Sequence, residues 1–166
     1  LEKKKMKLAR LKLSTRQVLE ENLPDAASVA NPVDVLGDAR ADRYRLAMET
    51  VAQDPNVDGI AIVLTPQAMT DIQETATAIG ELTEKTDKPV LACFMGEAEI
   101  EVGVEILAEY GVPNYAFPER SAMAFRAMAD YREIRILPEP EYVHFDVETD
   151  VGKQVLDTAI AYDCYV

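Results

Sequence analysis

The sequence has few of the residues that build metal centres and disulfide frameworks. Its 166 residues include one histidine and two cysteines, namely His144, Cys93 and Cys164. These three do not form a zinc signature, and distant cysteines indicate a reducing compartment without disulfides. Cys93 lies in an apolar run, where burial would raise the pKa of its thiol, so we interpret it as core. We interpret His144 as structural and predict no metal site.

Long apolar runs and basic residues are also scarce. No apolar run approaches the ~20 residues that cross a bilayer, and no signal peptide is recognisable. The chain has 17 Lys and Arg against 30 Asp and Glu, a net charge of -13. This charge argues against nucleic acids and anionic membranes as partners. We therefore expect a soluble cytoplasmic protein.

Basic residues gather at the N-terminus, in LEKKKMKLARLK. This block is either a solvated lead-in, which we favour, or a basic arm. The chain begins with Leu1 rather than Met. We expect it to be a piece of a longer protein.

The rest of the chain alternates between short apolar runs and amphipathic segments, which together can bury one core. Strands are predicted at 33–36, 59–64, 90–94 and 114–117, and helices at 14–22, 42–53, 69–86, 97–110, 118–132 and 151–162. This alternation predicts an α/β fold with a doubly wound, flavodoxin-like parallel sheet in three α/β/α layers. Both faces of the apolar run 59–64 should then be covered by helices.

Three parts follow along the chain. We predict a lead-in with a short helix over residues 1–23, the flavodoxin-like domain over 24–132, and an extended connector with a final helix over 133–166.

The segment AIVLTPQAMTD, residues 61–71, runs from a predicted strand into a predicted helix. Ligands of doubly wound sheets collect at this position, and the unpaired N–H groups of a helix start can hold an anion. The phosphate-binding candidates are Pro66, Gln67, Ala68, Met69 and Thr70, with a further contact from Thr65. The alternative is an ordinary helix start with Thr65 as N-cap and Pro66 in the first turn.

Other contacts are possible elsewhere at the same edge. Gly96 follows the strand 90–94, where it either lets backbone approach a ligand or makes the turn. Asn31, Asp34 and Gly37 lie in NPVDVLGDA, and Asp34 either contacts a ligand or caps a neighbouring turn through its carboxylate.

Common nucleotide-binding motifs are missing. The sequence has no G-x-G-x-x-G after a strand and no G-x-x-x-x-G-K-[ST]. It also lacks the Ser and Thr loop of flavodoxins and the acidic cluster of receiver domains. The fold by itself therefore leaves the function open.

Several motifs, in their order and spacing, resemble a known family. These are NPVDVLGDA at 31–39, VDGIAIVLTPQAMTD at 57–71, KPV at 88–90 with FMG at 94–96, and GVP at 111–113 with FPE at 117–119. The chain resembles, over about residues 24–132, the ligase domain of the alpha part of NDP-forming acyl-CoA synthetases. These are the ADP-forming acetyl-CoA synthetases, related to succinyl-CoA synthetase. A single glycine, Gly96, stands where relatives often carry a pair.

The resemblance implies a reaction in which acyl-CoA, ADP and phosphate give acid, CoA and ATP through a phosphorylated histidine. It implies that no catalytic residue lies in this chain, because the histidine belongs to another domain. The helix after TPQ would stabilise the phosphoryl group. CoA, ADP or ATP, phosphate and Mg²⁺ would serve the whole enzyme, not this domain alone.

The resemblance also implies partners. These would be CoA-binding, phosphohistidine and ATP-grasp domains, in the same protein or in a partner subunit. We expect an oligomer, and we expect the interface with the other domains to leave an exposed apolar patch on this one.

Two other functions stay open. The chain could be the acyl-CoA or nucleotide-sensing part of a protein acetyltransferase, without ligase activity. It could also be an interaction module whose acidic surface binds a basic partner.

Overall fold

The computed structural model describes residues 6–96, 98–139 and 149–162. The chain divides into two compact units, Leu1–Arg135 and Ile136–Val166. The first unit contains α1 (Leu13–Asn22), α2 (Ala41–Ala52), β1 (Ile60–Leu64), α3 (Ile72–Lys85), β2 (Val90–Phe94), the 3-10 helix η2 (Ala98–Ile100), α4 (Glu101–Glu109) and α5 (Pro118–Arg135). The second unit contains α6 (Thr149–Ala161). The predicted α/β class is confirmed, and the domain boundaries after residues 23 and 132 stay predictions.

β1 and β2 form a parallel sheet in which all five residues of each strand are paired. One further parallel bridge joins Ala92 of β2 to Asn114. Within the described ranges the sheet is therefore narrower than the doubly wound, flavodoxin-like sheet that we predicted.

Two predicted strands are wrong. In 114–117 only Asn114 makes a bridge, and in 33–36 only Asp34 does, in antiparallel pairing with Ser28. The chain turns where the earlier strand was expected, because Leu36 has a φ of +71°. A left-handed residue cannot continue an extended strand.

Helix cover of the sheet is uneven. β2 is buried along its whole length, whereas β1 alternates between buried and exposed residues, and Val63 is 44% exposed. The prediction that both faces of this strand are covered is therefore wrong. The physical reason is that α5 packs mainly against β2.

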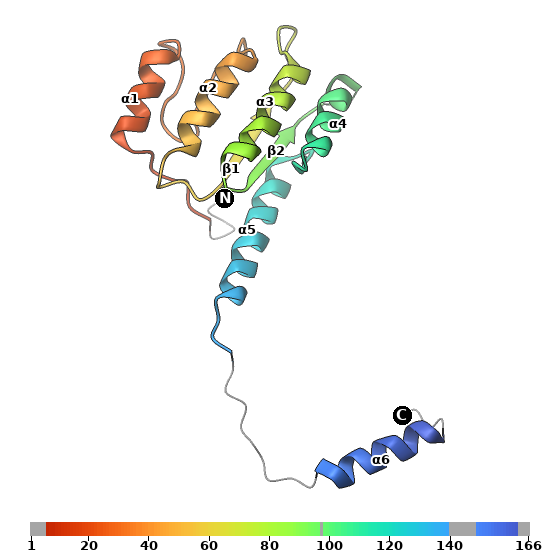
Figure 1. The fold of residues 1–166 in the computed structure, drawn as a ribbon. Helices are drawn as coiled ribbons and strands as arrows, with labels where there is room; N and C mark the ends of the chain where they lie inside the picture. Colours follow the sequence, from red (N-terminus) through yellow and green to blue (C-terminus); the bar gives the residue numbers. More distant parts are fainter. Residues whose placement is uncertain (1–5, 97, 140–148, 163–166) are drawn as a thin grey trace. The chain divides into compact units, whose positions relative to one another are not determined.

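Helices α1, α2, α3 and α4 lie side by side, and the two strands run behind α3 (Figure 1). Each helix packs against the next, and α2 also packs against β1. Burying one large aliphatic or aromatic side chain stabilises a fold by ~1.5–3 kcal/mol. The largest fully buried apolar side chains are Leu19, Leu64, Ile79, Leu82, Phe94 and Leu107.

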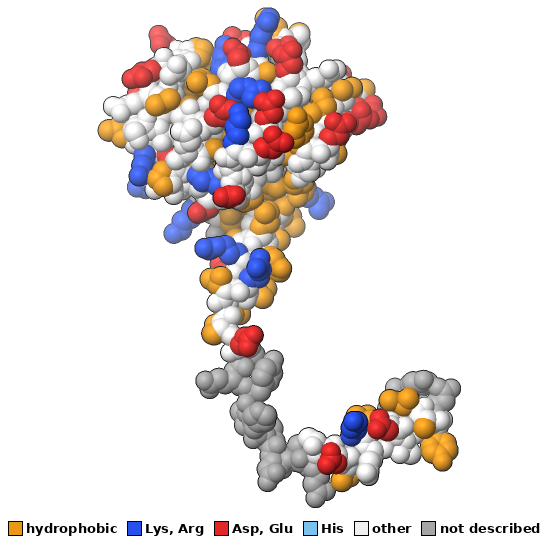
Figure 2. Space-filling model, viewed as in Figure 1, with side chains coloured by type: hydrophobic (Ala, Val, Ile, Leu, Met, Phe, Trp, Pro, Cys, Tyr) orange, Lys and Arg blue, Asp and Glu red, His pale blue; other side chains and the backbone are white. Residues whose placement is uncertain are grey.

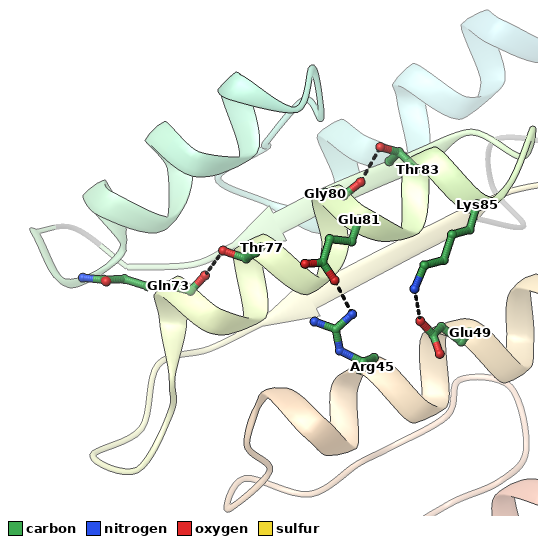
Figure 3. A network of polar contacts seen from close by, with 8 residues as sticks. All are labelled: Arg45, Glu49, Gln73, Thr77, Gly80, Glu81, Thr83 and Lys85. Carbon is green, nitrogen blue, oxygen red and sulfur yellow. Dashed lines mark hydrogen bonds and ion pairs between the residues drawn. The ribbon is translucent and has the colours of Figure 1, made fainter.

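Ion pairs also join α2 to α3 (Figure 3). Arg45 pairs with Glu81, and Lys85 Nζ lies 2.8 Å from Glu49 Oε1. All four side chains are at least a third exposed. Because exposed pairs contribute only ~0–1 kcal/mol, apolar packing contributes more than charge to holding these helices together.

Two glycines allow α3 and α4 to approach closely. A Cβ on Gly80 of α3 would lie 2.2 Å from Cγ of Tyr110, and a Cβ on Gly103 of α4 would lie 2.6 Å from Cγ2 of Ile72. These distances are shorter than any real non-bonded carbon contact, so a larger residue at either position would force the two helices apart.

Asp54 is a buried acid that ties three segments together. Its carboxylate accepts hydrogen bonds from the backbone N–H of Lys12 at 2.7 Å and of Asn56 at 2.9 Å. Its carbonyl accepts one from Lys88 Nζ at 2.6 Å. Burial raises the pKa of Asp54, but the N–H bonds, the Thr15 hydroxyl and the charge of Lys12 outweigh burial and lower it.

Apolar side chains gather on the surface around α5 (Figure 2). Ala122 and Phe125 are buried, whereas Met123, Met128 and Tyr131 are exposed. The helix predicted at 118–132 runs on to Arg135. An exposed apolar surface of this kind is what we expected at an interface with other domains.

Helix α6 has no buried residue. Its apolar side chains Val151, Val155 and Ile160 are all more than half exposed. His144, Cys164 and most of the predicted connector lie outside the described residues. None of the helices in the described part of the chain has the length and apolarity needed to span a membrane.

Replacing Gly80→Ala should lower the free energy of unfolding by about 1–3 kcal/mol, the usual cost of overpacking. The added methyl group overlaps the Tyr110 ring, and this outweighs the better helix propensity of alanine. Urea unfolding followed by circular dichroism measures the change. The control is Gly152→Ala in α6, where a Cβ meets nothing within 4 Å and no loss is expected. Equal stability of wild type and Gly80→Ala would contradict the close packing.

Replacing Asp54→Asn should cost about 1–2 kcal/mol at pH 7, because the charged acceptor of two N–H groups is lost. The folded pKa of Asp54 is lowered, so its stabilisation is complete above the unfolded pKa of about 4 and is lost as pH falls through the folded value. The difference between wild type and variant should therefore shrink below about pH 4. Urea titrations at pH 7, 5 and 3 measure it, with the exposed Asp58→Asn as control. A difference that stays constant with pH would exclude this role for the charge.

Candidate functional site

The two parallel strands end at the same edge of the sheet, and the loops that follow them meet there. Pairing continues one residue beyond the strands, where the N–H of Met95 donates to the Leu64 carbonyl at 2.9 Å. A Cβ on Gly96 would lie 3.3 Å from Cγ of Pro66 and 3.2 Å from Cγ2 of Ile100. Gly96 therefore makes a close contact with the loop after β1, and a side chain there would crowd that contact.

Residues 67–70 form a turn and not the start of a helix. The N–H of Thr70 donates to the Gln67 carbonyl at 2.9 Å, and the N–H of Gln67 donates to Thr70 Oγ1 at 2.9 Å. The helix predicted from residue 69 begins instead at Ile72. The reason is that Thr70 closes the turn with both its N–H and its hydroxyl, and Asp71 (φ -81°, ψ 79°) is not helical. The candidate segment Pro66 to Thr70 therefore precedes α3.

This turn is open to solvent. Thr65, Gln67, Ala68 and Met69 are exposed, and Pro66 and Thr70 are half-buried. The Gln67 side chain has no hydrogen-bond partner within the described ranges, whereas its backbone N–H is bonded within the turn.

The start of α3 keeps backbone donors but carries negative charge. No described residue accepts a hydrogen bond from the N–H of Gln73 or Glu74. Asp71 stands at the N-cap without a capping bond, and Glu74 lies in the first turn. Both carboxylates interact favourably with the helix dipole and would repel an anion. An anion held here would therefore need positive charge from elsewhere.

The segment 31–39 supplies a second turn at this edge. Asp34 Oδ1 accepts a hydrogen bond from the N–H of Leu36 at 2.9 Å, so the carboxylate caps a turn, as one of the two interpretations of Asp34 expected. A Cβ on Gly37 would lie 3.9 Å from Cγ of Gln67. Asn31 Nδ2 donates instead to the Ala9 carbonyl at 3.0 Å and ties the lead-in to this loop.

Arg43 holds the second turn and was not recognised from the sequence. Its Nη1 donates to the Val35 carbonyl at 2.9 Å and to Asp38 Oδ1 at 2.7 Å. The hydrogen bond from Arg43 lowers the pKa of the Asp38 carboxyl. The one signal in the sequence is an arginine five residues after Asp38, at the start of a predicted helix.

The structure thus brings together Gly37 with Gln67, and Pro66 with Gly96. Cys93 is buried in β2, where burial and then the charge of Glu119 raise the pKa of its thiol. In residues 6–96, 98–139 and 149–162, no group of three or more His, Cys, Asp or Glu side chains is placed to hold a metal ion.

Known proteins are similar to this chain in sequence. Residues 4–137 match the family described as the Ligase-CoA domain, so the chain belongs to that family. It is 31% identical over 153 residues to acetate–CoA ligase (ADP-forming) I of Archaeoglobus fulgidus, covering 92% of this chain and 21% of that protein. It is 37% identical over 132 residues to acetate–CoA ligase (ADP-forming) II subunit alpha of Pyrococcus furiosus, covering 77% of this chain and 29% of that protein. The resemblance to ADP-forming acyl-CoA synthetases is therefore confirmed.

A solved structure shares the fold. The dinucleotide-forming acetyl-coenzyme A synthetase 1 of Ca. Korarchaeum cryptofilum, in complex with phosphate and ADP, superposes with a TM-score of 0.73 and is 26% identical. The match covers 81% of this chain and 29% of that one. The chain thus spans less than a third of each of these relatives, which are larger proteins with further parts.

Proposed function

We propose that this chain is the Ligase-CoA domain of an ADP-forming acyl-CoA synthetase and helps to position a transferring phosphoryl group. The observation that carries the proposal is the family match over residues 4–137, together with ADP-forming ligases as relatives. The parent protein would convert acyl-CoA, ADP and phosphate into acid, CoA and ATP. The phosphorylated histidine would belong to another domain.

The loops at the carboxyl edge of the sheet suit a positioning role. Phosphoryl transfer depends mainly on orientation and on stabilisation of charge, with little covalent chemistry for the surrounding protein. Among the described residues, the free N–H groups of Gln73 and Glu74 and the exposed amide of Gln67 can serve as donors. A helix start contributes ~0.3–1 kcal/mol toward an anion, so these donors would orient the group more than bind it.

The remaining parts of the reaction would come from the rest of the parent protein. CoA-binding, phosphohistidine and ATP-grasp domains would hold CoA, the histidine and ADP or ATP. Mg²⁺ does not fit the acidic groups described in this chain, because none of them form a cluster that could hold a metal. We also propose that the whole domain has the flavodoxin-like, doubly wound arrangement of which β1, β2 and the Asn114 bridge form part.

Replacing Gln67→Ala in the complete parent protein should lower the yield of phosphoenzyme. Removing one hydrogen bond to the phosphoryl group corresponds to about 0.5–1.5 kcal/mol, roughly a two- to tenfold loss. Thr70→Ala should lower the yield similarly, because it removes the acceptor that fixes the Gln67 N–H. Phosphoenzyme is measured by incorporation of labelled phosphate in the presence of acetyl-CoA.

Thr70→Ser is the matched control, since its hydroxyl can accept the same hydrogen bond. It should retain the wild-type yield, and all variants should unfold at similar urea concentrations. Unchanged yield in Gln67→Ala and Thr70→Ala would exclude the positioning role of the turn. A parent protein that forms no ATP from several acyl-CoAs, ADP, phosphate and Mg²⁺ would exclude the synthetase and favour the sensing role.

A further inference from the structure

Arg43 joins α2 to both ends of the turn at 35–38. Its Nη1 is bonded to the carbonyl of Val35 at 2.9 Å and to Oδ1 of Asp38 at 2.7 Å. The Arg43 side chain is 22% exposed, whereas that of Asp38 is 61% exposed. One partly buried side chain thus ties an exposed turn to a helix.

The turn needs such support because of its backbone. Leu36 has a φ of +71°, in the left-handed region that non-glycine residues adopt at a cost. Two other bonds help, from the Leu36 N–H to Asp34 Oδ1 at 2.9 Å and from the Ala39 N–H to the Leu36 carbonyl at 3.2 Å. Neither bond connects the turn to another element. The bonds of Arg43 do, and together with Val35, which packs against the buried cluster of Leu19, Leu23 and Ala47, they help to fix where the turn lies relative to α2.

The position of the turn matters because Gly37 lies near Gln67. A Cβ on Gly37 would be in ordinary van der Waals contact with Cγ of Gln67, at 3.9 Å. The Gln67 residue is exposed, and a long exposed side chain has many rotamers. The Gly37 backbone therefore lies near Gln67 with the space of a side chain left open between them, and the position of the turn determines how much room the Gln67 side chain has on this side.

We propose that Arg43 is a positioning residue that acts through Gly37 to orient the Gln67 side chain toward the transferring phosphoryl group. This inference rests on the proposed function. Arg43 itself need not touch the phosphoryl group, because its role is to fix the turn that limits Gln67.

The test measures phosphoenzyme yield in the complete parent protein. Arg43→Met keeps most of the length of the side chain and removes its donors, and should lower the yield about two- to tenfold and no more than Gln67→Ala does, because it acts by misplacing the Gln67 amide. Arg43→Lys should restore most of the yield, because both bonds come from one nitrogen and an ammonium group can donate to two acceptors. Rescue by lysine distinguishes loss of the two hydrogen bonds to the turn at 35–38 from a general loss of packing.

A double variant tests whether Arg43 acts through Gln67. In a Gln67→Ala background, Arg43→Met should reduce the yield by less than about twofold, since no amide is left to orient. A loss in that background as large as the loss that Arg43→Met causes with Gln67 present would overturn the inference. So would wild-type yield in Arg43→Met.

Arg45→Met is the matched control on the same helix. Arg45 pairs with Glu81 of α3 (Figure 3) and makes no hydrogen bond to the turn at 35–38 among the described residues, so its loss should leave the yield unchanged.

If Arg43→Met fails to fold, Gly37→Leu replaces it, since a leucine side chain would displace Gln67 and should lower the yield more than Gly37→Ala does. Equal yields for these two variants would overturn the inference.

The result also separates the two proposals. A lower yield in Gln67→Ala together with wild-type yield in Arg43→Met overturns only the role of Arg43. Wild-type yield in both variants also overturns the positioning role of the turn at residues 67–70.

Discussion

The parallel pairing of β1 with β2 is the constraint on which the rest of the first unit depends. A parallel pair needs a crossover connection, and α3 with its two loops supplies it. Parallel strands that are paired in register end at the same edge, so the chain leaves Leu64 and Phe94 at neighbouring points. The contact of Pro66 with Gly96 follows directly from that geometry. A register shift of one residue would turn the alternating buried face of β1 to solvent.

The crossover helix is held by close packing more than by charge. Gly80 and Gly103 let α3 and α4 approach until the Tyr110 and Phe94 rings fill the space that side chains would otherwise occupy. The ion pairs between α2 and α3 are too exposed to determine the packing. Small residues on α3 and α4 therefore determine how these helices lie over the strands. Because α3 is the crossover between the strands, the same packing also limits where α3 can begin.

Much of this fold could be predicted from the sequence, because buried strands and amphipathic helices leave periodic signals. The apolar runs at 59–64 and 90–94 are strands, and their position identified the edge at which the loops gather. The predicted start of α3 was wrong by a few residues, because threonine favours both a helix cap and a closed turn and Thr70 makes the turn. The alternation at 33–36 resembled a strand, but it belongs to a turn with Leu36 in the left-handed region. Arg43 could not be predicted, because its role depends on contacts that α2 makes with a loop.

Electrostatics at the carboxyl edge argues that the described residues alone would hold an anion only weakly. Asp71 and Glu74 stand beside the free N–H groups of α3, so the attraction of the helix start for an anion is largely offset. The charge of Arg43 is shared with Asp38, and the chain as a whole carries a net charge of -13. Binding a doubly charged phosphate therefore requires cations from another source. The chain spans 21% of one ADP-forming relative and 29% of another, so under the proposed function these cations would come from the remaining parts of the parent protein.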